Sequence, residues 1–113
     1  MKMKAVILFE AGAAAPYAKS QPLRVEEVDL DPPQSNELLV RIGGAGLCHS
    51  DLSVINASMP RALPMVMGHE GAGEVVEIGS NIGDVEVGDH VVFQFRASCG
   101  RCRRCAEGRP ALC

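Results

Sequence analysis

Short apolar runs separated by turn residues make up most of this chain. Runs rich in Val, Ile and Leu predict strands at residues 4–9, 23–28, 37–42, 73–78 and 90–95. In the last run Val91, Phe93 and Phe95 fall on one side, which is the period of two that a strand shows. Gly, Pro, Asn and Asp between the runs predict tight turns. Many short strands joined in this way indicate a mainly β fold, either a small barrel or a sandwich.

One segment has the character of a helix instead. Ser50 and Asp51 are good capping residues ahead of an apolar stretch, so residues 48–56 are predicted to begin a helix. Residues 56–67 contain two prolines and are predicted to form a loop.

Size, charge and cysteine usage narrow the class of protein. The 113 residues are expected to form one domain, residues 1–113, with a modest core. A net charge of −3 argues against a general nucleic-acid binder. No apolar run approaches the roughly 18–20 residues that a membrane span needs. Five cysteines without an export signal predict a reducing, cytoplasmic location and favour metal ligation over disulfides.

A dinucleotide-binding loop is not predicted. Gly68, Gly71 and Gly73 lack the Gly-x-Gly-x-x-Gly spacing and lie in a β context. We therefore expect no site for NAD or NADP within these residues.

The strongest chemical signal is a cluster of cysteines at residues 96–113, here called the cysteine lobe. Its spacing, C-x2-C-x2-C-x7-C, suits a closed tetrahedral zinc site built from Cys99, Cys102, Cys105 and Cys113. The lobe has almost no apolar side chains, so metal is expected to decide its shape, and its arginines are expected to favour thiolates. Incidental or redox thiols, an iron–sulfur cluster and a nucleic-acid-binding zinc module are the alternatives at this point.

Cys48 and His69 offer two ligands for a second, open metal site. A catalytic zinc takes three protein ligands and keeps one position for water or substrate. Asp51 could hydrogen-bond the far nitrogen of His69, and Glu70 is a second acidic neighbour. Taken alone, Cys48 and His69 are weak evidence for a metal site, because a single Cys or His in a β-rich chain is more often a buried structural residue.

Three segments together resemble a known family. Residues 46–51 (GLCHSD), 68–79 (GHEGAGEVVEIG) and 88–91 (GDHV), followed by the cysteine lobe, are similar to the zinc-dependent alcohol dehydrogenases of the medium-chain dehydrogenase/reductase family. The resemblance covers essentially the whole chain. It implies a mainly β, GroES-like and partly open barrel with a short helix and a zinc-binding lobe at the C-terminal end. In such enzymes zinc acts as a Lewis acid on an alcohol that gives a hydride to NAD or NADP.

The resemblance also implies roles for single residues. Cys48 and His69 correspond to two catalytic zinc ligands. Ser50 corresponds to the hydroxyl that takes the alcohol proton, and Asp51 to the partner of the histidine. Glu70 corresponds to the acidic residue beside the metal.

Other residues take roles by the same resemblance. His49 corresponds to a pocket-wall residue that contacts substrate or cofactor phosphate. The methionine-rich loop at residues 59–67 either lines the substrate pocket or fills the core. The structural zinc ligands correspond to Cys99, Cys102, Cys105 and Cys113.

The chain also departs from the family pattern. Ser53 stands where many members carry a His, so the proton relay is expected to exit through water. The third catalytic cysteine and the nucleotide-binding domain are missing, so these residues alone are expected to be an inactive, truncated part of an enzyme that acts on alcohols, aldehydes or ketones. Bare apolar surface implies self-association. The alternative function is a stand-alone, non-enzymatic zinc-binding or interaction barrel.

Overall fold

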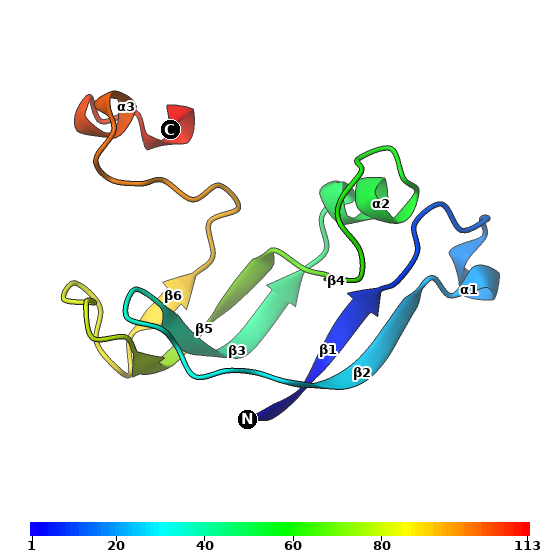
Figure 1. Ribbon diagram of the computed structural model, residues 1–113, viewed down its shortest axis with the longest axis horizontal. Coiled ribbons are helices and arrows are strands. Elements are labelled where there is room, and N and C mark those ends of the chain that lie inside the picture. Colours follow the sequence, from blue (N-terminus) through cyan, green and yellow to red (C-terminus); the bar gives the residue numbers. More distant parts are fainter.

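Two antiparallel sheets form the body of the molecule, and they do not close into a barrel (Figure 1). The computed structural model describes all residues, 1–113. The first sheet has the order β2-β1-β4, formed by Leu23–Asp29, Lys2–Leu8 and Met65–Val66. The second has the order β3-β5-β6, formed by Leu38–Gly46, Glu70–Ile78 and His90–Val92. The mainly β, partly open fold expected from the sequence is confirmed.

Four short helical segments connect and flank the sheets. They are α1 (Tyr17–Ser20), α2 (His49–Ile55), α3 (Arg103–Ala106) and the 3-10 turn η1 (Pro110–Leu112). None of them has the length and apolar character needed to cross a bilayer. Figure 1 shows α3 and η1 within the cysteine lobe, which stands away from both sheets.

The small core ties α2 to the first sheet. Leu8 at the end of β1 is fully buried and packs with Val54 and Ile55 of α2. Burying a side chain of this kind contributes about 1.5–3 kcal/mol. Tyr17 and Met59 are partly buried against the same cluster. This packing holds the last turn of α2 against the first sheet, and the candidate site lies at the opposite end, where α2 begins.

Two strand predictions were wrong in detail. The predicted strand at residues 90–95 ends at Val92, because only one more backbone bond, from Phe93 N–H to the Gly71 carbonyl oxygen at 2.8 Å, follows it. The predicted loop at residues 56–67 contains the two-residue strand β4, which pairs with the end of β1. Such a short strand is defined by its partner and has no periodicity of its own.

Candidate functional site

The pairing of β3 with β5 brings the two candidate ligands of the open site together. Gly46 at the end of β3 lies opposite Glu70 at the start of β5. Cys48 follows β3 by two residues and His69 immediately precedes β5, so both stand at the same end of the strand pair. A Cβ atom at position 46 would collide with the Glu70 side chain, which explains the glycine there.

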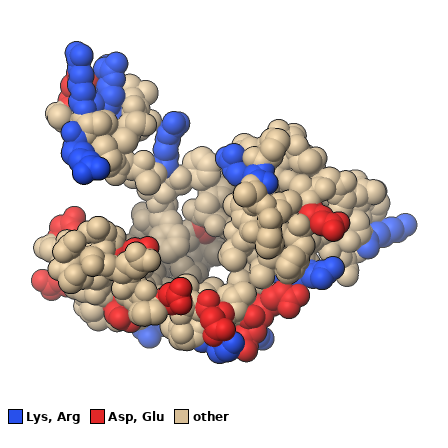
Figure 2. All heavy atoms as spheres, viewed as in Figure 1, with Lys and Arg blue, Asp and Glu red and all other residues tan.

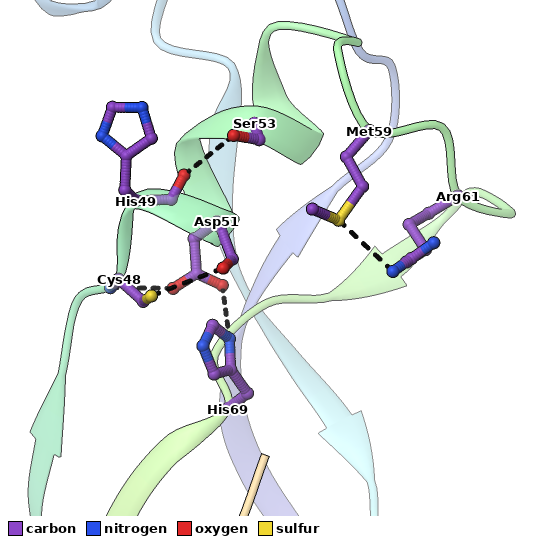
Figure 3. Close-up of polar contacts among 8 residues, drawn as sticks. Cys48, His49, Asp51, Ser53, Met59, Arg61 and His69 are labelled. Atoms are coloured by element: carbon purple, nitrogen blue, oxygen red, sulfur yellow. Dashed lines mark hydrogen bonds and ion pairs between the residues drawn. The ribbon is translucent and has the colours of Figure 1, made fainter. Parts of the chain in front are cut away.

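Cys48, His69 and Glu70 form a set with the geometry of a metal site. One ligand atom from each residue lies within 4.8 Å of the others. His69 Nδ1 lies 3.1 Å from Asp51 Oδ1, which leaves the other ring nitrogen, Nε2, for a metal (Figure 3). Cys48 Sγ lies 3.5 Å from Ser50 Oγ. Thiolate, imidazole and carboxylate are the ligand types that zinc accepts, so these residues fit that ion.

Asp51 positions the cluster from within α2. Its Oδ2 accepts a hydrogen bond from the Cys48 backbone N–H at 3.2 Å, which closes the first turn of the helix. The residue at the N-cap is Cys48, so the prediction that Ser50 caps the helix was wrong, and Asp51 acts from the third position of the helix. The reason is that the helix starts at His49, two residues earlier than a hydroxyl cap at Ser50 would allow.

Hydrogen bonding shifts both candidate ligands toward their charged forms. The pKa of Cys48 is lowered, chiefly by the hydrogen bond from Ser50 and then by His69. The pKa of His69 is raised, first by Cys48 and then by Asp51. The thiolate and the imidazolium therefore favour each other. A metal cation bound to both side chains would take the place of protons on the thiol and on the imidazole.

A cavity of about 70 Å³ opens beside this cluster. Ser50, Asp51 and His69 line it, and the ring of Phe95 stacks at a tilt on His69 with centroids 4.6 Å apart. Met59 belongs both to this wall and to the packing around the core. That the methionine-rich loop lines a substrate pocket stays a prediction.

Two lining residues outside every predicted site segment, Val54 and Phe95, were missed by the sequence reasoning, and Arg61 was covered only as part of the loop at residues 59–67. No motif marks Val54 or Phe95. The apolar pattern assigned Phe95 to a strand, whereas the chain has left β6 at that point and turns the ring toward His69.

His49 and Ser53 lie outside this cavity. His49 is exposed, and Figure 3 shows its ring pointing away from the Cys48–Asp51–His69 cluster. Its contact with substrate or cofactor stays a prediction. Ser53 Oγ donates a hydrogen bond to the His49 carbonyl oxygen at 3.1 Å, so its hydroxyl is occupied within the helix.

The cysteine lobe gathers its four thiols around one point. All four Sγ atoms lie within 4.8 Å of one another, and all the cysteines are free. Cys102 Sγ lies 3.6 Å from Cys105 Sγ and 3.9 Å from Cys113 Sγ. A tetrahedron with Zn–S bonds of about 2.3 Å has edges of about 3.8 Å, so the lobe fits a single zinc ion. Gly100 and Gly108 have φ angles of 71° and 74°, which allow the two turns of the lobe.

Backbone amides, and not arginine side chains, set the charge of the lobe thiols. The N–H groups of Arg101 and Cys102 lower the pKa of Cys99 to about 6. Burial raises the pKa of Cys105 to about 11. Figure 2 shows the arginine side chains of the lobe projecting outward. The sequence analysis expected arginine charges to favour the thiolates, whereas the thiol pKa values that are lowered are lowered chiefly by backbone N–H groups.

Comparison with known proteins bears on both sites. The family model described as the alcohol dehydrogenase GroES-like domain matches residues 34–113. The chain is 44% identical over 113 residues to the NDMA-dependent alcohol dehydrogenase of Amycolatopsis methanolica, covering 100% of this chain and 28% of that protein. It therefore spans less than a third of the length of this relative.

Solved structures give the same result. Benzyl alcohol dehydrogenase from Acinetobacter calcoaceticus matches with a TM-score of 0.86 and 35% identity, over 100% of this chain and 29% of that chain. A cobalt- and zinc-bound thermostable alcohol dehydrogenase from Pyrobaculum aerophilum matches with a TM-score of 0.83 and 30% identity, over 100% and 32%. Since the family match covers well over half of the chain, this protein belongs to the zinc-type alcohol dehydrogenases and contains their GroES-like domain.

Proposed function

We propose that this chain forms the N-terminal catalytic portion of an NAD(P)-dependent alcohol dehydrogenase, with Cys48 and His69 as two ligands of a catalytic zinc. In this proposal Cys99, Cys102, Cys105 and Cys113 hold a structural zinc. The observation that carries the proposal is the meeting of Cys48, His69 and Asp51 beside one cavity at the end of β3 and β5. This chain covers only 28% and 29% of the length of these two relatives. That small share supports the proposal that the chain belongs to a longer polypeptide whose other residues bind the cofactor.

Each residue of the cluster has a chemical task in this proposal. Zinc, when bound, supplies Lewis-acid activation of the substrate hydroxyl. Asp51 accepts a hydrogen bond from the Nδ1–H of His69 and so fixes the tautomer that presents Nε2 to the metal. Glu70 stands as the acidic residue beside the metal.

Ser50 lines the cavity next to Cys48, so its hydroxyl relays the proton that the substrate hydroxyl loses: Ser50 Oγ accepts that proton while its own hydroxyl proton passes on. The proton then leaves through water, since the Ser53 hydroxyl is engaged with a carbonyl oxygen of the helix. The hydride acceptor is NAD or NADP, and the substrates are primary or secondary alcohols, aldehydes or ketones. His49 contacts substrate or cofactor phosphate from the exposed side of α2. The cytoplasm, where thiols stay reduced, is the compartment that suits both cysteine sites.

The test uses the longer polypeptide that contains this chain. Formation of NAD(P)H from a panel of alcohols is measured for the wild type and for the variants Cys48→Ala and His69→Ala, with His90→Ala as a matched control at an exposed histidine. Loss of a metal ligand should reduce kcat/KM by more than about 100-fold, whereas the control should stay close to wild type. This chain alone should show no turnover. Turnover by the chain alone, or full activity of Cys48→Ala, would contradict the proposal and favour a non-enzymatic metal-binding barrel.

We also infer that the isolated chain self-associates. A groove of about 520 Å³ between the two sheets is lined entirely by apolar side chains, among them Met3, Val40 and Phe93. Val92 in this groove is 80% exposed. Contiguous apolar surface of this kind is rarely left in water. Sedimentation should show concentration-dependent dimers or larger species, and a strict monomer at all concentrations would contradict the inference.

A further inference from the structure

Arg61 is the one Lys or Arg side chain on the wall of the site cavity. It lies on the loop between α2 and β4, and the same cavity is lined by Ser50 and His69. Figure 3 draws Arg61 and Met59 on this loop, across from the Cys48–Asp51–His69 cluster. A permanent positive charge on an exposed side chain therefore lies on the wall of this cavity.

The Arg61 guanidinium has no carboxylate partner. Its Nη2 donates to Met59 Sδ at 3.3 Å and its Nη1 to the Pro60 carbonyl oxygen at 3.3 Å. The acidic group in the cavity wall, Asp51, is occupied by His69 and by the Cys48 backbone N–H. Since a guanidinium carries five N–H donors, most of those of Arg61 are free for an incoming ligand.

Other arginines of the chain are held differently. Arg41 pairs with Glu74, and both Arg103 and Arg104 pair with Glu107. Those side chains stabilise the surface. Arg61 differs because it is both unpaired and adjacent to the candidate reaction site.

The shape of the cavity limits which part of a substrate reaches the cluster. A volume of about 70 Å³ is small beside the roughly 300–1,000 Å³ of a pocket that encloses a drug-sized ligand. A hydroxymethyl or aldehyde group fits beside Ser50 and His69. The remainder of a larger substrate has to extend past the apolar side chains of Met59 and Phe95 toward Arg61.

We propose that Arg61 determines specificity for alcohols or aldehydes that carry an anionic group, a carboxylate or a phosphate, at the end remote from the reacting carbon. This inference rests on the proposed dehydrogenase function. An Arg–carboxylate or Arg–phosphate pair is charge-assisted and often bidentate, so it favours anionic over neutral substrates. Because the pair lies away from the reacting carbon, it contributes equally in the ground state and in the transition state. Its loss therefore raises KM and leaves kcat unchanged.

The experiment compares two substrates in the longer polypeptide, an ω-hydroxycarboxylate and the neutral primary alcohol of the same chain length. Wild type should have a kcat/KM at least about tenfold higher for the hydroxycarboxylate. Arg61→Gln should raise KM for the hydroxycarboxylate about tenfold without changing kcat, and should leave the neutral alcohol unaffected. Arg61→Lys, which keeps the positive charge, should retain part of the preference for the hydroxycarboxylate that Arg61→Gln loses. Arg109→Gln, which removes an unpaired and exposed charge from the cysteine lobe, should behave as wild type.

Other outcomes would overturn the inference in distinguishable ways. If Arg61→Gln raises KM for NAD(P) with both substrates, Arg61 serves the cofactor phosphates and not the substrate. Equal kcat/KM for the two substrates in wild type and variant would show that Arg61 is a solvated surface residue. Absence of any alcohol oxidation in wild type would remove the proposed function itself. Circular dichroism of Arg61→Gln should match wild type, so that a fault in folding is not read as specificity.

Discussion

Asp51 is the one buried charged side chain of the molecule, and it holds two elements together. One carboxylate oxygen accepts the Cys48 N–H at the start of α2, and the other lies 3.1 Å from His69 Nδ1, next to β5. A carboxylate buried with both oxygens engaged is satisfied, whereas its removal leaves two donors without partners. The stability of the chain and the orientation of the candidate ligand therefore depend on the same residue.

Replacing Asp51 with Ala should lower the free energy of unfolding by about 1–3 kcal/mol, because the helix loses its cap and His69 loses its partner. Urea unfolding in the presence of a chelator measures this without any contribution from metal. Asp29→Ala is the matched control, since Asp29 makes only an exposed ion pair with Lys2 at 2.8 Å. That change should cost less than about 1 kcal/mol. Equal losses for the two variants would contradict the role given to Asp51.

The lobe thiols should titrate far apart when metal is removed. The pKa of Cys99 is about 6, lowered from 9.0 by backbone N–H donors, so Cys99 is a thiolate at neutral pH. Its contribution to stability is present above the unfolded pKa and is lost as the pH falls through about 6. Burial raises the pKa of Cys105 to about 11, so that thiol stays protonated at neutral pH.

Alkylation by iodoacetamide, followed by mass spectrometry of the metal-free chain, measures this difference. Labelling of Cys99 should rise through about pH 6, while Cys105 stays largely unlabelled near neutrality. In concentrated urea both thiols should titrate together, because the folded amide donors and the burial are gone. Equal labelling of the two thiols in the folded chain would mean that the lobe loses its shape without metal.

At the scale of elements, the β3–β5 pair is the frame of the site. Its register shifts twice, between Leu39 and Val40 and again between Ile42 and Gly44, and the second shift restores the first register, which sets Gly46 opposite Glu70. The apolar pattern predicted both strands, because each has a run of branched side chains. It could not predict the extension of β3 to Gly46 or of β5 to Glu70, since glycine-rich ends carry no periodicity. The motif residues Cys48 and His69 could be found from sequence, whereas their distance depends on that extension.

Gly73 in β5 tests this frame directly. A Cβ at this position would collide with the Arg41 carbonyl oxygen on β3, a backbone atom that cannot move aside alone. Gly73→Ala should therefore destabilise the chain by about 1–3 kcal/mol in urea unfolding. Gly83→Ala is the control, because a Cβ added there would have open space within 4 Å. That variant should be neutral or slightly more stable, and similar losses in both would mean that β3 and β5 are not closely paired at Gly73.

At the scale of the whole molecule, the chain is more open than its size requires. Its radius of gyration is 16.5 Å, against about 13 Å for a compact domain of this length. Its accessible surface is 8429 Å², against about 6,000 Å² for a folded monomer of this mass. The extended cysteine lobe and the open groove between the sheets account for the difference (Figure 1). The apolar pattern alone predicted only short strands, whereas the open shape was expected from the family resemblance, because such a shape depends on which faces find a partner.

The cysteine lobe should be the part of the molecule that depends most on metal. It contains no buried residue, so hydrophobic burial cannot hold it, whereas structural zinc contributes an apparent ~10–16 kcal/mol near neutral pH. Elemental analysis should give about one zinc per chain, held by the four thiols, because the Cys48 site has fewer ligands. Chelation or Cys102→Ser should lower amide protection in residues 96–113, because the metal-free lobe opens more often, and should leave protection in β1 and β2 unchanged. Zinc that survives Cys102→Ser would place the tightly bound ion at Cys48 and His69, and iron in place of zinc would overturn the assignment of the lobe.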